Sequence, residues 1–202
     1  MLTHDLGRKN FGDTANSGNA ISKEEAITLL YDWVKNDRLR LHMIQVGWLM
    51  KCWAEEKENL PPNTIWHWQL AGLLHDADWD QWPEQHCKKI IGELEHRKVD
   101  PEILHAIACH GPAYFGVEPE SNMDKMLYAF DELSGFVHAY SLMRPNQYAG
   151  MEVKGVLKRM KDKTFAANVS REDIKDASER CGIPVEELIG FVIEHQPAAT
   201  EL

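Results

Sequence analysis

The sequence predicts an all-α fold, a bundle of about eight to nine helices, and three observations lead to that expectation. Apolar residues recur at helical spacing over most of the chain. Residues that begin and end helices separate these stretches. No convincing strand pattern and no internal repeat is present. We therefore expect one helical domain over residues 21–202.

The first half of the chain begins with a segment that differs from the rest. Residues 1–20 are rich in Gly, Asn, Asp and Thr and show no apolar period, which predicts a flexible leader. The first helix is expected to begin at Ser22, because Ser22 and Glu25 have the spacing of a capping box. Asn63 is the expected N-cap of the third helix. Further helices of this half are expected over about 37–57, 63–76 and 83–97. Asp80 is the expected N-cap of the last of these, and Asp78 is expected to be a loop carboxylate.

The second half carries clearer helix signals. Asp100 followed by Pro101 predicts a cap and a first helical residue, for a helix that ends at Gly111. Ser170 is the expected cap of the penultimate helix, and Gly182 its expected stop. The helices are expected over about 101–111, 123–143, 151–162, 171–181 and 184–195, with a loop over residues 111–121.

Composition and charge narrow the class of protein. The net charge is −10, from 22 Lys and Arg against 32 Asp and Glu. A nucleic-acid polymer needs a basic surface, so we expect none as a partner, and expect a small anionic substrate in a local positive pocket. No stretch resembles a membrane span or a secretory signal, so no membrane partner is expected. The four cysteines lack paired spacing, which favours reduced thiols and a cytoplasmic location. The oligomeric state stays open.

Four histidines and two aspartates occur in the order H…HD…H…H…D. Imidazole nitrogens and carboxylate oxygens suit divalent metals, with Fe or Mn expected first and Ni, Co or Zn as alternatives. Six such ligands are enough to hold two metals if one carboxylate bridges them. Two adjacent metals form a clamp for the attacking and leaving oxygens of a phosphoryl transfer. The six residues are His42, His75, Asp76, His86, His110 and Asp131.

The expected helix positions of these residues bear on their role. His75 and Asp76 end the third expected helix, where both side chains can reach one cluster although they point about 100° apart. Asp76 at a helix C-terminus needs a compensating cation. Asp131 lies mid-helix in an apolar segment, and a buried carboxylate there needs a partner. An isolated His42 would be read as a core histidine, and the rest of the set makes it a ligand candidate.

The segments around these residues resemble the HD superfamily of metal-dependent phosphohydrolases. The resemblance is carried by the segments LRLHMIQV, LAGLLHDADWD and YAFDELSGF. EQHCKKIIGELEHRKVDPEILHAIACHG and FAANVSREDI resemble a branch of small, stand-alone predicted HD hydrolases. The resemblance covers roughly residues 25–195 and implies an HD-domain-like helical bundle. It also implies that Asp76 bridges the metals, and that His86 and His110 add the second metal.

Phosphate binding calls for cations near these ligands. Arg38 lies one helical turn before His42 on the same face, which makes it a candidate for substrate binding and catalysis. Lys125 and Arg144 are further candidates by their proximity in the sequence, although each is also readable as a surface charge. His138 is a candidate substrate-facing base, with an ordinary polar helix residue as the alternative. Asp76 completes the catalytic set as the bridging carboxylate.

Three functions fit this pattern. The leading one is hydrolysis of a phosphate ester or anhydride in a small metabolite, with a nucleotide as the first expectation, through metal-activated water. The second is a di-iron oxygenase, because some HD-fold proteins such as myo-inositol oxygenase use the same order of ligands. The third is a metal-stabilised binding module without turnover. Oxygen consumption with reduced iron separates the second function from the first.

Overall fold

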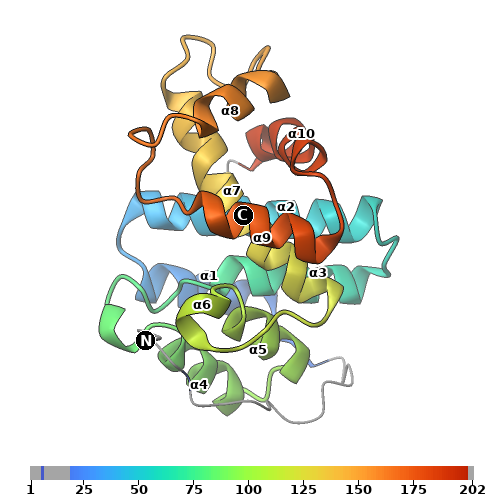
Figure 1. Cartoon of the computed structure of the whole chain (residues 1–202). Coiled ribbons are helices and arrows are strands. Elements are labelled where there is room, and N and C mark those ends of the chain that lie inside the picture. The colour runs from blue at the N-terminus through green and yellow to red at the C-terminus, as the bar shows by residue number, and fades with distance from the viewer. Residues whose placement is uncertain (1–5, 7–18, 200–202) are drawn as a thin grey trace.

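The computed structural model describes residue 6 and residues 19–199, and in these residues it is helical without strands (Figure 1). The all-α prediction is confirmed. Most of the expected leader, residues 1–20, lies outside the described residues. The α-helices are α1 (Lys23–Trp33), α2 (Asp37–Glu56), α3 (Pro62–Leu74), α4 (Lys88–His96), α5 (Pro101–Ala108), α6 (Pro112–Phe115), α7 (Asn122–Leu142), α8 (Val153–Met160), α9 (Arg171–Cys181) and α10 (Val185–His195).

Helices α2 and α3 form the closest helix pair and run side by side across the middle of the molecule (Figure 1). Their backbones approach through two glycines. A Cβ atom added at Gly72 would lie 2.9 Å from the Cα atom of Gly47, a distance that leaves no room for a side chain. This contact brings His42 on α2 and His75 at the end of α3 together, with ring centroids 5.3 Å apart.

Helix α7 is the third element that positions the site. It packs against α2 on one side and against α9 on another, and Figure 1 shows α9 crossing in front of it. Most of its length is buried, including Phe130, Leu133 and Phe136, so α7 is a central helix of the core. Asp131 lies next to Phe130 in this helix. Burial of these large apolar side chains fixes the rotation of α7, and with it the direction of Asp131.

Helices α4, α5 and α6 form the lower part of the molecule in Figure 1. Helix α5 packs against α3 and α4. Asp100 caps α5 by accepting a hydrogen bond from the amide of Glu102 at 3.1 Å, and Pro101 is its first residue, as predicted. His110 follows two residues after the last residue of α5. No helix in the described part of the chain has the length and apolar character needed to cross a bilayer.

Several predicted helix ends are also confirmed. Ser22 and Glu25 form both hydrogen bonds of a capping box, so the amides of both residues have an acceptor at the start of the helix. Ser170 caps α9, and Gly182 ends it in the left-handed conformation with φ of +68°.

Some predicted boundaries differ from the structure. The helix expected over residues 101–111 ends at Ala108, not at Gly111. The third helix begins at Pro62 with Pro61 at the N-cap, so Asn63 is not its cap. The expected loop over residues 111–121 contains the single-turn helix α6. The helix expected from residue 83 is interrupted: residues Pro83–Gln85 form a 3-10 turn, and α4 begins only at Lys88.

Candidate metal centre

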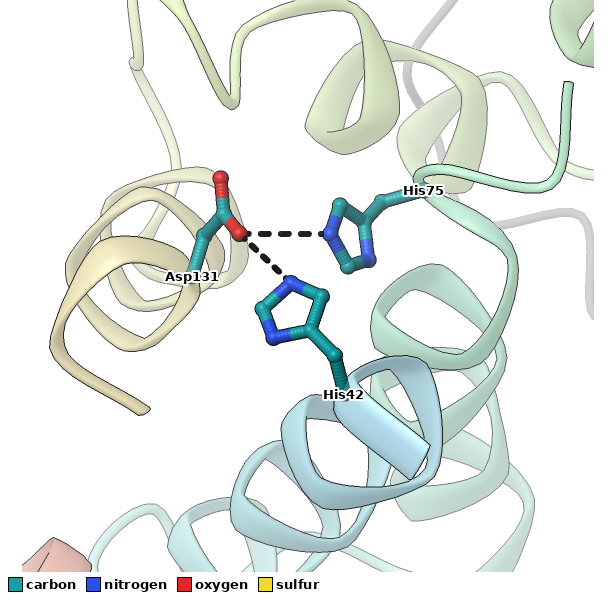
Figure 2. Close-up of side chains that lie close together, drawn as sticks. All are labelled: His42, His75 and Asp131. Atoms are coloured by element: carbon teal, nitrogen blue, oxygen red, sulfur yellow. Dashed lines mark hydrogen bonds and ion pairs between the residues drawn. The ribbon is translucent and has the colours of Figure 1, made fainter. Parts of the chain in front are cut away.

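Two histidines and one aspartate from three different helices meet at the first part of the site (Figure 2). Nε2 of His42 lies 3.0 Å from Oδ1 of Asp131, and Nε2 of His75 lies 3.3 Å from the same oxygen. Figure 2 shows both rings pointing at this carboxylate, His42 from α2 and His75 from the end of α3. Residues 89 positions apart are thus in contact.

Asp76 joins this group to a second pair of histidines. Its Oδ1 lies 3.3 Å from Nε2 of His86 and 3.6 Å from Nε2 of His110. Its Oδ2 faces the other way, 3.6 Å from Nε2 of His75. Asp76 therefore has one carboxylate oxygen toward each histidine group, which is the arrangement that a bridging ligand requires.

The second ring nitrogen of each histidine has an acceptor of its own. Nδ1 of His75 lies 2.8 Å from the carbonyl oxygen of Gly72, and Nδ1 of His110 lies 2.6 Å from that of Ile107. A carbonyl only accepts, so in both rings Nδ1 carries the proton and Nε2 has the free electron pair that binds a metal. Nδ1 of His86 lies 2.8 Å from Oδ1 of Asp78, which supports the same tautomer.

The donor set fits divalent metals. Ligand atoms about 2.1 Å from a common metal lie about 3.0–3.5 Å from one another, and the contacts described above fall close to this range. Nε2 of His75 is buried and forms no hydrogen bond among the described residues, and its free electron pair faces carboxylate oxygens of Asp131 and Asp76 at 3.3 and 3.6 Å. Such an atom is costly to bury unless it has a partner. A divalent metal between His75, His42 and Asp131 would provide that partner.

Without a metal, the charges of the cluster depend on one another. Burial alone would lower the pKa of His75, but the carboxylates of Asp76 and Asp131 outweigh it and raise that pKa to about 9. Burial likewise opposes ionisation of both aspartates, yet the surrounding histidines hold the pKa of each carboxyl below its usual range. The cluster therefore favours ionised carboxylates that require a positive partner, whether a proton on His75 or a metal.

A cavity of about 320 Å³ opens beside the cluster. Three kinds of side chain line it: metal-ligand candidates, aromatic rings, and further polar or acidic groups. Among the described residues that line it, none is a lysine or an arginine. The lining residues are Asp76, Trp79, His86, His110, Gly111, Tyr114, Phe115, Asp131, Glu132, Asn168 and Asp173.

None of the three basic residues predicted to bind substrate lines this cavity. Arg38 is exposed on the first turn of α2. Lys125 lines a separate pocket together with Cys181. The guanidinium of Arg144 donates to the backbone carbonyls of the 147–150 turn, at 2.9 Å for Gly150, and so holds that turn in place. The structure therefore does not bring Arg38, Lys125 and Arg144 together with the metal-ligand candidates.

His138 lies near His42 but does not line the cavity. Its Nδ1 is 3.0 Å from the hydroxyl of Tyr148 and 3.3 Å from Nε2 of Gln45. Burial, with a smaller contribution from the nearby His42, lowers the pKa of His138. These contacts place it in a hydrogen-bond network behind the ligands, and give no support to its predicted role as a substrate-facing base.

Three residues of the site were not predicted in their observed roles. Asp78, expected as a loop carboxylate, is fully buried and holds His86. Glu132 and Asp173 line the cavity. Burial, followed by the neighbouring Asp131 carboxylate, raises the pKa of Glu132 to about 8. The sequence carries one signal for Glu132, because it directly follows the ligand candidate Asp131, whereas Asp173 reaches the cavity only through the packing of α9 on α7.

Two other groups of residues in the described chain have side chains close enough to hold an ion. One contains His105, Cys109 and Asp124, and the other contains Cys52, Glu56 and His195. Neither shares a carboxylate between two histidine pairs. The cluster around Asp76 is therefore the main candidate metal centre.

Comparison with known proteins finds no match for this chain among protein-family models, curated protein sequences or solved structures.

Proposed function

We propose that the protein is a dinuclear metal-dependent phosphohydrolase that acts on a small phosphorylated metabolite. The observation that carries this proposal is the position of Asp76. One of its carboxylate oxygens lies toward His75, which belongs to the group of His42, His75 and Asp131, and the other lies toward His86 and His110. Paired metals with one shared carboxylate suit an in-line displacement at phosphorus.

Each part of the site has a distinct task in this proposal. Bound metals would supply Lewis acidity and lower the pKa of a water molecule so that it can attack phosphorus near neutral pH. The histidines and aspartates would hold these ions beside the cavity. Phe115 covers His86 and His110, with ring centroids 5.3 and 4.9 Å away, and limits the access of bulk water on that side. The cavity of about 320 Å³ is at the small end of the range for ligand sites, which favours a small substrate.

The first experiment is metal analysis of the purified chain, followed by a phosphatase and nucleotidase screen with Mn, Fe, Co and Ni. Asp76→Ala is expected to abolish turnover and weaken both metals, because one carboxylate serves both. The double variant His86→Ala/His110→Ala is expected to retain about one metal per chain. Near wild-type activity in Asp76→Ala on a confirmed substrate would reject the proposal, and metal binding without turnover on any substrate would favour a binding module.

One observation favours a second candidate, the di-iron oxygenase. Phosphoryl transfer commonly uses a cationic side chain in addition to metals. No lysine or arginine is found among the described residues that line the cavity. An oxygenase does not share this requirement. Oxygen consumption by protein loaded with reduced iron, in the presence of candidate substrates, would support the oxygenase over the hydrolase.

A further inference from the structure

The cavity beside the histidines is also lined by two carboxylates that the metal centre does not use. Glu132 comes from α7 and Asp173 from the first turn of α9, and both line the cavity. Asn168 lines it as well, from the segment that precedes α9. With Asp76 and Asp131, the described lining contains four carboxylates and no basic side chain other than histidine.

Local contacts hold the Glu132 carboxylate and the backbone of Asp173 in place. Oε2 of Glu132 accepts a hydrogen bond of 3.0 Å from the amide of Ser170, which ties α7 to the start of α9. The hydroxyl of Ser170 in turn accepts from the amide of Asp173 at 3.1 Å. Glu132 and Asp173 are thus attached to the same N-terminal turn of α9. Two carboxylates that line one cavity repel each other when both are ionised, and a positive group between them would relieve that repulsion.

Aromatic rings at the same cavity add a second and independent feature. Trp79 and Tyr114 line the cavity and are 45% and 51% exposed, which makes them two of the few large apolar side chains on the described surface. The face of an indole or phenol ring attracts organic cations. Exposed aromatic rings that share a cavity with carboxylates can therefore contribute to the binding of an ammonium group.

The charges at the cavity also favour a substrate with a positive group. The described lining already contributes four carboxyl groups, those of Asp76, Asp131, Glu132 and Asp173. A phosphate monoester adds about two further negative charges. None of the described lining residues is a lysine or arginine that would offset them. A positive group on the substrate itself would offset part of this charge.

We propose that Glu132 and Asp173, with Trp79 and Tyr114, form a subsite for the protonated amine of a small aminoalkyl phosphate. This inference rests on the proposed function and names its substrate class. The phosphate oxygens would lie at the metal ligands and the ammonium group at the acidic wall. Water attacks phosphorus and the bond from phosphorus to the ester oxygen breaks, so that the products are inorganic phosphate and an amino alcohol whose oxygen has gained a proton from water.

Two matched compounds test the subsite with the full-length, manganese-loaded protein. They are 2-aminoethyl phosphate and propyl phosphate, which have the same chain length and differ in an ammonium against a methyl group. Binding is measured by calorimetry and hydrolysis by phosphate release. We expect 2-aminoethyl phosphate to bind at least about tenfold more tightly, a difference typical of one paired charge in a partly buried site. Equal or tighter binding of propyl phosphate would overturn the inference.

Variants assign the preference to particular residues. Asp173→Asn and Glu132→Gln each keep the shape of the side chain, and Glu132→Gln retains an oxygen that can accept from the Ser170 amide. Each is expected to reduce the preference for the amine about tenfold, through KM for 2-aminoethyl phosphate, with propyl phosphate unchanged. Glu172→Gln, in the same turn of α9 but exposed and outside the cavity lining, is the control and should keep the preference. A preference that survives in both cavity variants would overturn the subsite.

The binding measurement separates this inference from the proposed function. If no phosphate ester is hydrolysed with any metal, the proposed hydrolase fails, whereas selective binding of 2-aminoethyl phosphate that is lost in Asp173→Asn still supports the subsite. If phosphate esters are hydrolysed without preference for the amine, the subsite fails and the hydrolase stands.

Discussion

Asp78→Asn is the substitution that tests most directly how the second histidine pair is organised. Asp78 is fully buried, and its carboxylate accepts three hydrogen bonds. Oδ1 accepts from Nδ1 of His86 at 2.8 Å and from the amide of Cys87 at 3.2 Å, and Oδ2 accepts from the amide of Ile90 at 2.9 Å. Asparagine has the same size, but one of its two terminal atoms is a donor.

The magnitude follows from these three contacts. If the side-chain oxygen of the introduced asparagine keeps His86 and Cys87, its NH₂ group faces the Ile90 amide, and two donors oppose each other in a buried place. A donor left unsatisfied costs about 1–3 kcal/mol of folding stability. The ring of His86 also loses its charged acceptor. Loss of such a partner typically weakens metal binding about ten- to a hundredfold, or about 1.4–2.7 kcal/mol.

Two assays and one control decide the outcome. Competition with a chelator under native conditions measures metal affinity, and urea denaturation of the metal-free chain measures stability. Asp80→Asn is the matched control, because Asp80 is also an acceptor for backbone amides, those of Lys35 and Asn36, but has no contact with a ligand histidine. Asp78→Asn that loses stability yet binds two metals as tightly as the wild type would refute the reasoning.

Two further predictions concern stability. Gly72→Ala is expected to lower the free energy of unfolding, measured in urea, by about 1–3 kcal/mol, because its Cβ would lie 2.9 Å from the facing backbone. Gly92→Ala is the control, since a Cβ there meets nothing within 4 Å, and it should leave the free energy of unfolding unchanged. An equal loss in both variants would contradict the close contact at Gly72. The hydrogen bond to Asp124 raises the pKa of His105 above its usual value of 6.5. Burial of Asp124 opposes ionisation of its carboxyl group, but the hydrogen bond from His105 outweighs burial and lowers the pKa of Asp124 below its usual value of 3.8. Protonated His105 therefore contributes its full stabilisation of the folded state below pH 6.5, and this stabilisation is lost as the pH rises through the raised pKa. The stabilisation from ionised Asp124 is lost as the pH falls below about 3.8. The stability deficit of His105→Gln should therefore be largest between about pH 4 and 6.5, and a deficit that grows at higher pH would contradict this assignment.

The sequence predicts where a helix begins when the residue that caps it lies within a few positions of that start. The side chains of three predicted caps each accept a hydrogen bond from an amide two or three residues ahead, and the structure confirms all three: Ser22, Asp100 and Ser170. The start of α4 was predicted several residues too early, because its N-terminus is capped from a distance, by Asp78 through the amides of Cys87 and Ile90. Local rules pointed instead to Asp80, whose carboxylate caps a different segment.

The convergence of the metal-ligand candidates was predictable from residue type and order, whereas the lining of the cavity was not. Lys125 precedes Asp131 by six residues, and about 100° per residue turns it to the other side of the helix. Arg144 lies beyond the end of α7, where helix geometry no longer predicts direction. Asp173 is 42 positions from Asp131, and only the packing of α9 against α7 brings it to the cavity.

The backbone carbonyls that hold His75 and His110 have a consequence for how such a site can change over time. Each histidine follows the end of its helix, and its Nδ1 reaches the carbonyl of the residue three positions earlier. Every amino acid supplies that carbonyl, so the identity of Gly72 or Ile107 does not matter for this purpose. Most of the surrounding sequence can therefore diverge while both rings keep the same nitrogen free, provided that the two helices still end where they do. The same feature makes a helix end a ready place to graft a metal-binding histidine, because no partner side chain has to be designed with it.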